Sequence, residues 1–178
     1  MQSLLDLDTI QAAIAGKRQA QEALYVQYSP TMFGICLRYA SDYHSAEDIL
    51  QEGFVKVFKN LDRFRGDGSF EGWMKRIFIN TSIEFYRKAV NKRKIIEMDS
   101  VYDQGSAPLA LDNLAAKDIL KIIQKLPNGY RTIFNLYAIE GYTHREIGAM
   151  LGISEGTSKS QLARAREAIR MKIQTQNV

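Results

Sequence analysis

Few residues in this sequence have the types and spacing that enzymatic chemistry requires. Asp48 and Glu52 stand one helical turn apart, where two carboxylates could share acid–base work or bind a metal ion. His44 and His144 are the only histidines, Cys36 is the only cysteine, and the sequence has no phosphate-binding loop. We therefore predict that the protein is not an enzyme and has no metal ion, cofactor or small-molecule substrate. Catalysis by the carboxylate pair is the less favoured alternative.

Nucleic-acid binding is better supported than catalysis. The segment that supports it is residues 152–167, GISEGTSKSQLARARE. Gly152 can supply a left-handed turn and Ser154 can cap a following helix. The side of this helix that we expect to face the core comprises Ser158, Leu162, Ala165, Ile169 and Ile173, spaced three and four residues apart. The other positions carry amide and guanidinium groups that can pair with base edges, and hydroxyl and ammonium groups that can hold phosphates. The predicted contacts with duplex DNA are Ser154, Thr157, Lys159, Ser160, Gln161, Arg164 and Arg166.

The residues before Gly152 predict a partner for that helix. Thr143 and Glu146 have the spacing of a capping box, and Ile147 and Leu151 supply an apolar face. A short helix, a glycine turn and a longer basic helix make a helix-turn-helix. Two further helices are expected before it, one that ends at Pro127 and one from Asn128 to the Gly141 stop.

Aromatic and basic side chains alternate over residues 63–88, a mixture that suits single-stranded nucleic acid. Ser69 can cap a long helix that starts near Phe70, and the glycines at 66, 68 and 72 loosen the preceding loop. We expect Phe78 and Phe85 to lie in the core. Phe64, Arg65 and Phe70 are better placed for bases, and Trp73 suits either role.

Residues 45–61, SAEDILQEGFVKVFKNL, predict an amphipathic helix that Ser45 can cap. Its polar face is acidic at first and gains lysines one turn later. Such a face often just complements the helix dipole and forms ion pairs, but it could also bind a basic partner.

The charge is spread unevenly along the 178 residues, whose net charge is +4. Residues 113–178 carry ten Lys or Arg and five Asp or Glu, whereas residues 94–112 carry one Lys and four acids. The acidic stretch mixes Gly, Ser, Ala, Pro and Asp without a clear helical or strand periodicity, and helical patterns flank it. We predict an all-α protein with two small helical domains, residues 1–93 and 113–178, joined by a flexible linker at 94–112. No secretory signal or membrane span is evident, so we expect a cytoplasmic protein without membrane insertion.

Two segments together resemble the extracytoplasmic-function (ECF) sigma factors of the sigma-70 family. They are AEDILQEGFVKVFKNLDRFRGDGSFEGWMKRIFINTSIEFYRK and LPNGYRTIFNLYAIEGYTHREIGAMLGISEGTSKSQLARAREAI, and they stand in the family's order. The resemblance implies a transcription initiation factor that binds bacterial core RNA polymerase and promoter DNA, with an anti-sigma factor as a further partner. It implies a region 2-like first domain and a region 4-like second domain, whose last helix reads the −35 element.

The resemblance also assigns roles within the first domain. The implied contacts with core polymerase are Asp48, Gln51, Glu52 and Lys56. The implied contacts with the melted −10 element are Phe64, Arg65, Phe70, Trp73, Arg76 and Asn80. Melting needs no chemical catalysis, because stacking and a fitted pocket can offset the cost of extruding a base.

A free-standing helix-turn-helix regulator remains an alternative function. Such a protein binds duplex DNA as a dimer and needs no polymerase, but this function leaves the first domain unexplained.

The sequence departs from the family at two positions of the last helix. Where the family commonly has GTV followed by a basic residue, Ser and Arg, this chain has GTSKSQ. Ser158 places a hydroxyl on the inward face, where we expect a bond back to a helix carbonyl. Gln161 has a neutral amide where the family commonly has the charged guanidinium group of an arginine.

Replacing Gln161 by arginine tests the second departure. An amide pairs well with adenine and makes fewer phosphate or guanine contacts than a guanidinium group. We therefore expect Gln161→Arg to steepen the salt dependence of DNA binding and to shift the −35 preference. Gel-shift titrations at several salt concentrations measure both. An unchanged salt slope together with an unchanged base preference would contradict the prediction.

Overall fold

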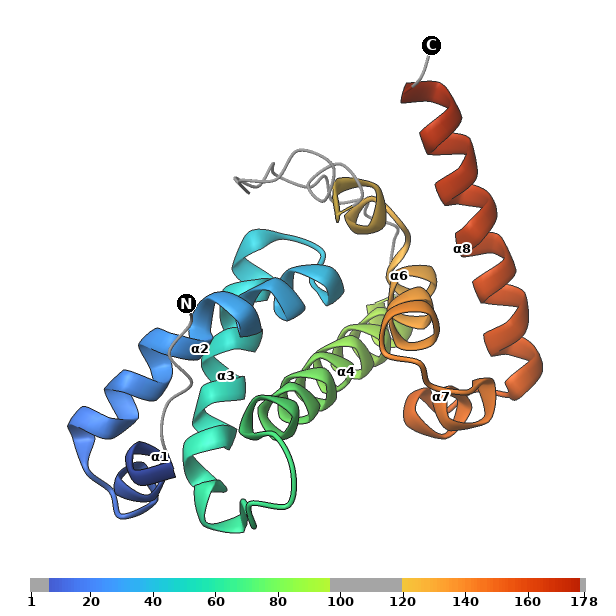
Figure 1. Cartoon of the computed structure of the whole chain (residues 1–178). Helices are drawn as coiled ribbons and strands as arrows, with labels where there is room; N and C mark the ends of the chain where they lie inside the picture. Colours follow the sequence, from blue (N-terminus) through green and yellow to red (C-terminus); the bar gives the residue numbers. More distant parts are fainter. Residues whose placement is uncertain (1–6, 97–119, 177–178) are drawn as a thin grey trace.

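The described part of the chain is built from helices. The computed structural model describes residues 7–96 and 120–176, and these two ranges contain no β-strand (Figure 1). The predicted all-α fold is therefore confirmed. None of the helices in these ranges combines the length and the apolar character that crossing a bilayer requires.

The N-terminal half, residues 7–96, is a bundle in which α2, α3 and α4 pack on one another and α1 packs on α2. Its elements are α1 (Leu7–Ile14), α2 (Arg18–Tyr39), α3 (Tyr43–Lys59), the 3₁₀ helix η1 (Leu61–Arg63) and α4 (Phe70–Ile96). The side chains buried most completely between them are Leu24, Met32, Leu37, Val57, Met74 and Phe78. Removal of this apolar surface from water is the main force that holds the bundle together.

Helix α3 begins earlier than the sequence analysis predicts. Asp42 is its cap: Oδ1 accepts a hydrogen bond from the Ser45 amide, and Oδ2 accepts one from the Ser45 hydroxyl, both at 2.8 Å. The predicted cap at Ser45 is therefore wrong, because the Asp42 carboxylate is a charged acceptor for the same turn. Burial by itself would raise the pKa of Asp42, but the hydrogen bonds from Ser45 and Ser41 outweigh burial and lower it.

The crossing of α3 over α4 is close-packed at Gly53. The ring of Phe78, on α4, is fully buried, as the sequence predicts. A Cβ atom added to Gly53 would lie 2.3 Å from Cε1 of that ring. The two helices can therefore approach this closely only because position 53 has no side chain.

The C-terminal half, residues 120–176, contains the predicted helix-turn-helix. Residues 120–124 are helical, and the elements that follow are α6 (Asn128–Phe134), the π-helical segment η2 (Asn135–Ile139), α7 (His144–Leu151) and α8 (Glu155–Gln176). The expected helix from Asn128 thus finishes as a wider π-helical turn, before Gly141 adopts a left-handed conformation with φ 78°.

Local caps shape the turn between α7 and α8. The capping box between Thr143 and Glu146 is formed, Gly152 is left-handed with φ 68°, and the Ser154 hydroxyl accepts from the Thr157 amide at 3.0 Å. These three features confirm the prediction. A Cβ on Gly148 would lie 2.8 Å from the Ile153 carbonyl oxygen, so the turn packs directly on α7.

The buried side of α8 is shorter than predicted. Ser158, Leu162 and Ala165 are buried and Ile169 is half-buried, but Ile173 is 43% exposed. Placing Ile173 in the core was wrong, because the last turns of α8 project beyond the helices on which it packs (Figure 1).

The two halves meet at the carboxyl end of α2. Gln124 Nε2 donates to the Leu37 carbonyl at 3.0 Å, Asn135 Nδ2 to the Arg38 carbonyl at 2.6 Å, and Arg131 Nε to the Tyr39 carbonyl at 3.1 Å. The Arg38 guanidinium also pairs with Glu140 at 2.7 Å. Three consecutive carbonyls that a helix end leaves unpaired thus find donors in the other half of the chain.

The predicted domain boundaries lie partly outside the described residues. Helix α4 continues through residues 94–96, which the sequence analysis assigns to the linker. The remaining linker residues, 97–112, lie outside the described ranges. The division into domains 1–93 and 113–178 stays a prediction.

Substitution at Gly53 tests the packing of the bundle. Gly53→Ala should lower the free energy of unfolding by about 1–3 kcal/mol, because the new methyl group would overlap the Phe78 ring. Gly34→Ala on α2 is the matched control: apart from its chain neighbours and the backbone of its own helix, nothing lies within 4 Å of its added Cβ, and alanine is about 1 kcal/mol more favourable than glycine inside a helix. Urea unfolding followed by circular dichroism measures both. A loss of stability at Gly34→Ala as large as that at Gly53→Ala would contradict the packing account.

Candidate nucleic-acid interface

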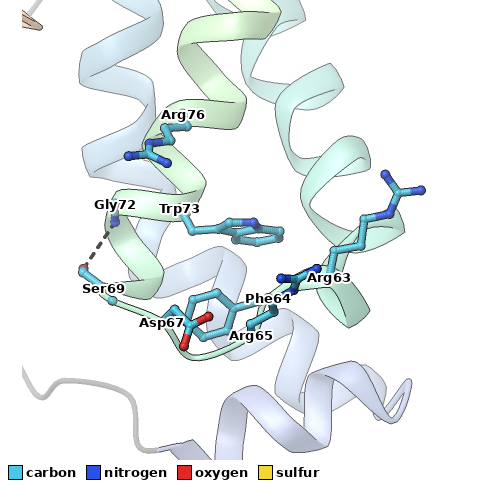
Figure 2. A pocket seen from close by; sticks show the side chains of 9 residues that line it. Arg63, Phe64, Arg65, Asp67, Ser69, Gly72, Trp73 and Arg76 are labelled. Carbon is cyan, nitrogen blue, oxygen red and sulfur yellow. Dashed lines mark hydrogen bonds between the residues drawn. The ribbon is translucent and has the colours of Figure 1, made fainter.

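An open pocket lies where the loop after η1 meets the start of α4. It has a volume of about 360 Å³ and is lined by Arg63, Phe64, Arg65, Asp67, Gly68, Ser69, Gly72, Trp73 and Arg76 (Figure 2). We call it the aromatic pocket. The Trp73 ring projects from α4 toward the loop, and its centroid lies 5.6 Å from that of Phe64. Small-ligand sites typically measure roughly 300–1,000 Å³, so the pocket is large enough for a nucleobase.

Glycine and serine residues shape the loop that forms this pocket. Gly66 and Gly68 adopt φ values of 79° and 111°, which residues with a Cβ rarely do. The Ser69 hydroxyl accepts from the Gly72 amide at 3.3 Å and caps α4, as predicted (Figure 2). Gly72 belongs to the first turn of α4, not to the loop where the sequence analysis places it.

The aromatic pocket is rich in positive charge. Arg63, Arg65 and Arg76 are exposed at its rim, together with the single carboxylate of Asp67. Guanidinium groups hold phosphates and also stack on planar rings. Exposed cations around half-buried aromatic rings are the combination with which proteins bind unstacked nucleotides.

Most residues predicted to contact melted DNA lie in or beside this pocket. Those that line it are Phe64, Arg65, Trp73 and Arg76. Phe70 does not, because its side chain is only 6% exposed and packs in the core. Its ring centroid lies 5.0 Å from that of Phe64 and 5.5 Å from that of Trp73. Phe70 therefore supports the two pocket rings from the core side.

Asn80 lines a neighbouring hollow on α4. This hollow, of about 300 Å³, is formed by Lys56, Asn60, Arg63, Trp73, Ile77, Asn80, Thr81 and Glu84. Arg63 and Trp73 line both hollows, so the two adjoin. Asn80 is exposed and follows Trp73 by two helical turns. Its role in contacting melted DNA stays a prediction.

Apart from the glycines, three lining residues were not among the predicted contacts: Arg63, Asp67 and Ser69. All three belong to the short stretch RFRGDGS, which surrounds the predicted residues Phe64 and Arg65. The signal that could have found them is the pair of glycines, because a tight loop brings all its side chains to one place.

The exposed face of α8 carries most of the residues predicted to contact duplex DNA. Lys159, Ser160, Arg164 and Arg166 are exposed, Thr157 is half-buried, and Ser154 is exposed at the cap. Lys159 pairs with Glu155 at 2.7 Å on the same helix. The Arg166 guanidinium lies 5.6 Å from the centre of the Tyr137 ring. Lys159 and Arg166 therefore already have partners within the chain, whereas Arg164 projects from α8 with its guanidinium exposed.

Gln161 does not point outward with its neighbours. It is half-buried, and a Cβ added to Gly129 on α6 would lie 2.8 Å from Gln161 Oε1 and 3.5 Å from the Tyr86 hydroxyl. Gln161 Oε1 is buried and has no hydrogen-bond partner among the described residues. The side chain thus lies at the contact between the two halves, and its role in base reading stays a prediction.

The Ser158 hydroxyl has a different partner from the expected one. Its Oγ lies 2.9 Å from Nδ1 of His144, the first residue of α7. The expectation of a bond back to a helix carbonyl was therefore wrong. A partner on another helix outcompetes the local carbonyl, because the fold places the His144 ring beside it.

The predicted polymerase contacts lie on the solvent side of α3. Asp48 and Gln51 are exposed and Glu52 is half-buried; we call these three residues the acidic face. Lys56 lies one turn further, with Nζ 2.6 Å from Glu84 of α4 and 3.9 Å from Glu52. Lys56 therefore ties α3 to α4 at the second hollow, and the acidic face keeps its negative charge.

The remaining chemical candidates are buried or scattered. Within residues 7–96 and 120–176 there is no group of three or more His, Cys, Asp or Glu side chains that could hold a metal ion. Cys36 is buried in α2, and burial raises the pKa of its thiol to about 12. A thiol with so high a pKa is a poor nucleophile, as expected for a core residue.

Two family models match the chain in the order that the fold displays. Residues 24–92 match Sigma-70 region 2, and residues 116–169 match Sigma-70, region 4. The aromatic pocket and the acidic face lie in the first match, and the helix-turn-helix lies in the second. Together these regions define the chain as an RNA polymerase sigma factor of the sigma-70 family. Within that family it belongs to the extracytoplasmic-function group, as its relatives indicate.

Curated relatives match over nearly their whole length. The RNA polymerase sigma-H factor of Pseudomonas aeruginosa is 29% identical over 177 residues, which cover 92% of this chain and 91% of the relative. The ECF RNA polymerase sigma-E factor of Escherichia coli is 28% identical over 185 residues, covering 97% and 96%.

Solved structures have the same fold. The sigma factor RpoE of Bartonella quintana, solved with the anti-sigma factor NepR, is similar with a TM-score of 0.56 and 23% identity, covering 86% of this chain and 96% of that one. CnrH, solved with the cytosolic domain of CnrY, is similar with a TM-score of 0.50 and 21% identity, covering 94% and 96%.

Removal of the indole tests the aromatic pocket. In a complex with core polymerase, Trp73→Ala should slow promoter opening roughly fivefold or more, because base–aromatic stacking is worth about 1–3 kcal/mol. Permanganate reactivity of unpaired thymines measures the opening. Lys75→Ala is the matched control, since Lys75 lies on the same helix outside both hollows and forms an ion pair with Glu71 of that helix. Equal rates for Trp73→Ala and Lys75→Ala would contradict the assignment.

Proposed function

We propose that the two halves of this sigma factor read two separate promoter elements. The aromatic pocket captures an unstacked base of the −10 element, with Asn80 beside it. The exposed face of α8 reads the −35 element as duplex, and Arg164 is an exposed residue of that face. The observation that carries the proposal is the aromatic pocket, which combines two half-buried rings with three exposed arginines in the half that matches region 2.

The free energy of binding favours capture of an unstacked base without any chemical step. Unstacking a base costs a few kcal/mol, and stacking on Trp73 or Phe64 returns about 1–3 kcal/mol. The arginines at the rim add phosphate contacts that stabilise the separated strand. The protein therefore acts by binding and not as an enzyme, and the polymerase performs the chemistry of transcription.

We infer that the contact between the two halves opens when both elements are read. Arg87 of α4 donates to the Met150 carbonyl of α7, which ties the helix-turn-helix to α4. Trp73 and Arg87 are fourteen residues apart on α4. At 1.5 Å per residue, the helix-turn-helix is therefore attached to α4 about 21 Å from Trp73. The −10 and −35 elements lie about 25 base pairs apart, or roughly 85 Å at 3.4 Å per base pair. The described arrangement is too short to span that distance.

The acidic face is the proposed contact with core polymerase. Asp48 and Gln51 are exposed, and the Glu52 carboxylate interacts with Lys56 only at 3.9 Å. A basic surface of the polymerase would complement these side chains. Binding there would hold the N-terminal half in place while the C-terminal half separates from it to reach the −35 element.

An anti-sigma factor is a further proposed partner, acting in the cytoplasm where transcription takes place. RpoE of Bartonella quintana, which has the same fold, was solved with the anti-sigma factor NepR. A partner that covers the acidic face or keeps the halves together would prevent polymerase binding. The alternative of a free-standing dimeric regulator is not favoured, because it gives no role to residues 24–92.

Transcription in vitro tests the proposed function. Core polymerase with this protein should produce discrete transcripts from fragmented genomic DNA, and core polymerase alone should not. Arg164→Ala should weaken transcription from those promoters, and the loss should be smaller when the −35 element is already mutated. Glu167→Gln, on the same helix, is the control. The absence of protein-dependent start sites would contradict the proposal. So would a loss of transcription by Arg164→Ala that is equally large with an intact and with a mutated −35 element.

A further inference from the structure

A partly buried polar contact joins the two helices of the helix-turn-helix. Ser158 on α8 is 0% exposed, and its Oγ lies 2.9 Å from His144 Nδ1 on α7. The next inward residues of α8, Leu162 and Ala165, are apolar. The hydrogen bond is therefore a directional contact within an otherwise apolar seam.

The His144 ring is itself held in place from a third element. It stacks on Tyr137 of η2, with ring centroids 4.5 Å apart and an angle of 22° between the planes. Arg166 of α8 lies 5.6 Å from the same Tyr137 ring. The chain of contacts thus leaves α8 at Ser158 and returns to it at Arg166, eight residues or about 12 Å further along the helix.

Holding α8 at two points fixes its rotation as well as its position. Apolar contacts are non-directional, so Leu162 and Ala165 alone would tolerate a small turn of the helix about its axis. A hydrogen bond weakens steeply when its distance or angle departs from the preferred values. A turn of α8 would also separate the Ser158 hydroxyl from His144 and leave it only a local helix carbonyl as acceptor.

The outward residues of α8 follow this rotation. Ser160 and Arg164 stand two and six positions after Ser158 on a rigid helix, so their directions are fixed relative to its hydroxyl. Base reading depends on such directions, because paired hydrogen bonds to a base edge have a narrow geometry.

We infer that the His144–Ser158 hydrogen bond determines promoter specificity, by setting the rotation of α8 in the major groove. His144 and Ser158 are positioning residues in this inference, because Ser158 is buried and the His144 ring packs on Tyr137 and Ser158, so both act through α8. The inference rests on the proposed function of α8 as the reader of the −35 element.

The test compares −35 preferences within each protein. A promoter found with this protein is made into a pool in which each −35 position is varied and all else is constant. Core polymerase transcribes the pool with the wild-type protein, Ser158→Ala, His144→Phe or the double variant. His144→Phe keeps a ring for stacking on Tyr137 but removes Nδ1. The yield from each template is divided by the total yield obtained with the same protein. A smaller folded fraction of a variant lowers the yields from all templates by the same factor and leaves these ratios unchanged.

Two further variants serve as controls. Ser158→Thr keeps a hydroxyl, and Ala149→Ser adds one at an exposed position of α7. Both should give the wild-type preference profile. Ser158→Ala and His144→Phe should each change at least one −35 preference by about threefold or more, as expected for loss of a hydrogen bond worth about 1 kcal/mol. The double variant should change it no further, because both substitutions remove the same contact.

The outcomes separate this inference from the function on which it rests. A wild-type profile with clear −35 preferences that neither single variant alters overturns the inference alone. Effects of the two substitutions that multiply in the double variant also overturn it. A flat wild-type profile overturns the proposed role of α8 and the inference with it.

Discussion

The carboxyl end of α2 lies at the point where the two halves of the described structure meet. Leu37, Arg38 and Tyr39 present three consecutive carbonyls, each of which accepts from a side chain of the C-terminal half. The central donor group is Arg131, which is 2% exposed and also donates to the Gln124 carbonyl at 2.8 Å. Burial lowers the pKa of this guanidinium to about 10, which leaves it charged at neutral pH. A cation at the end of a helix also complements the helix dipole.

Because of this contact, the protein has two arrangements, with the halves together or separated, that differ in free energy. While the halves are together, the α2 carbonyls are paired and Gln161 lies between α6 and α4. When the halves separate, water must satisfy the three carbonyls and the guanidinium regains its hydration. Exchange of protein hydrogen bonds for water costs only about 0.5–1.5 kcal/mol for each bond. A partner as large as polymerase can therefore supply the free energy of opening through its own interface.

Features that depend on neighbouring residues were predictable from the sequence. The capping box at Thr143, the turn at Gly152 and the caps at Ser154 and Ser69 each involve residues within a few positions of one another. Features that depend on tertiary contacts were not. The burial of Phe70, the partner of Ser158 and the caps on α2 all involve residues that only the fold brings together. The cap of α3 was missed for a local reason, because Asp42 precedes the apolar pattern by several residues.

The same distinction applies to the interfaces. The order of the two matched regions was evident from sequence motifs, and the pocket rings Phe64 and Trp73 were among the predicted residues. The shape of the pocket depends on the left-handed conformations of Gly66 and Gly68, and the close crossing of α3 and α4 at Gly53 likewise became evident only from the structure. The position of Gln161 at the contact between halves also required the structure, because its spacing on α8 alone points toward solvent.

The central claim is that one chain reads two DNA elements far apart, with the aromatic pocket and with α8. Site-specific photo-crosslinking in the complex of core polymerase, this protein and a promoter tests it most directly. A photoreactive residue in place of Trp73 should crosslink to the opened −10 strand, and one in place of Ser160 should crosslink to the −35 duplex. The two sites should lie about 25 base pairs apart, or roughly 85 Å along B-form DNA. Crosslinks from both positions to one short DNA segment, or from neither position to DNA, would contradict the account.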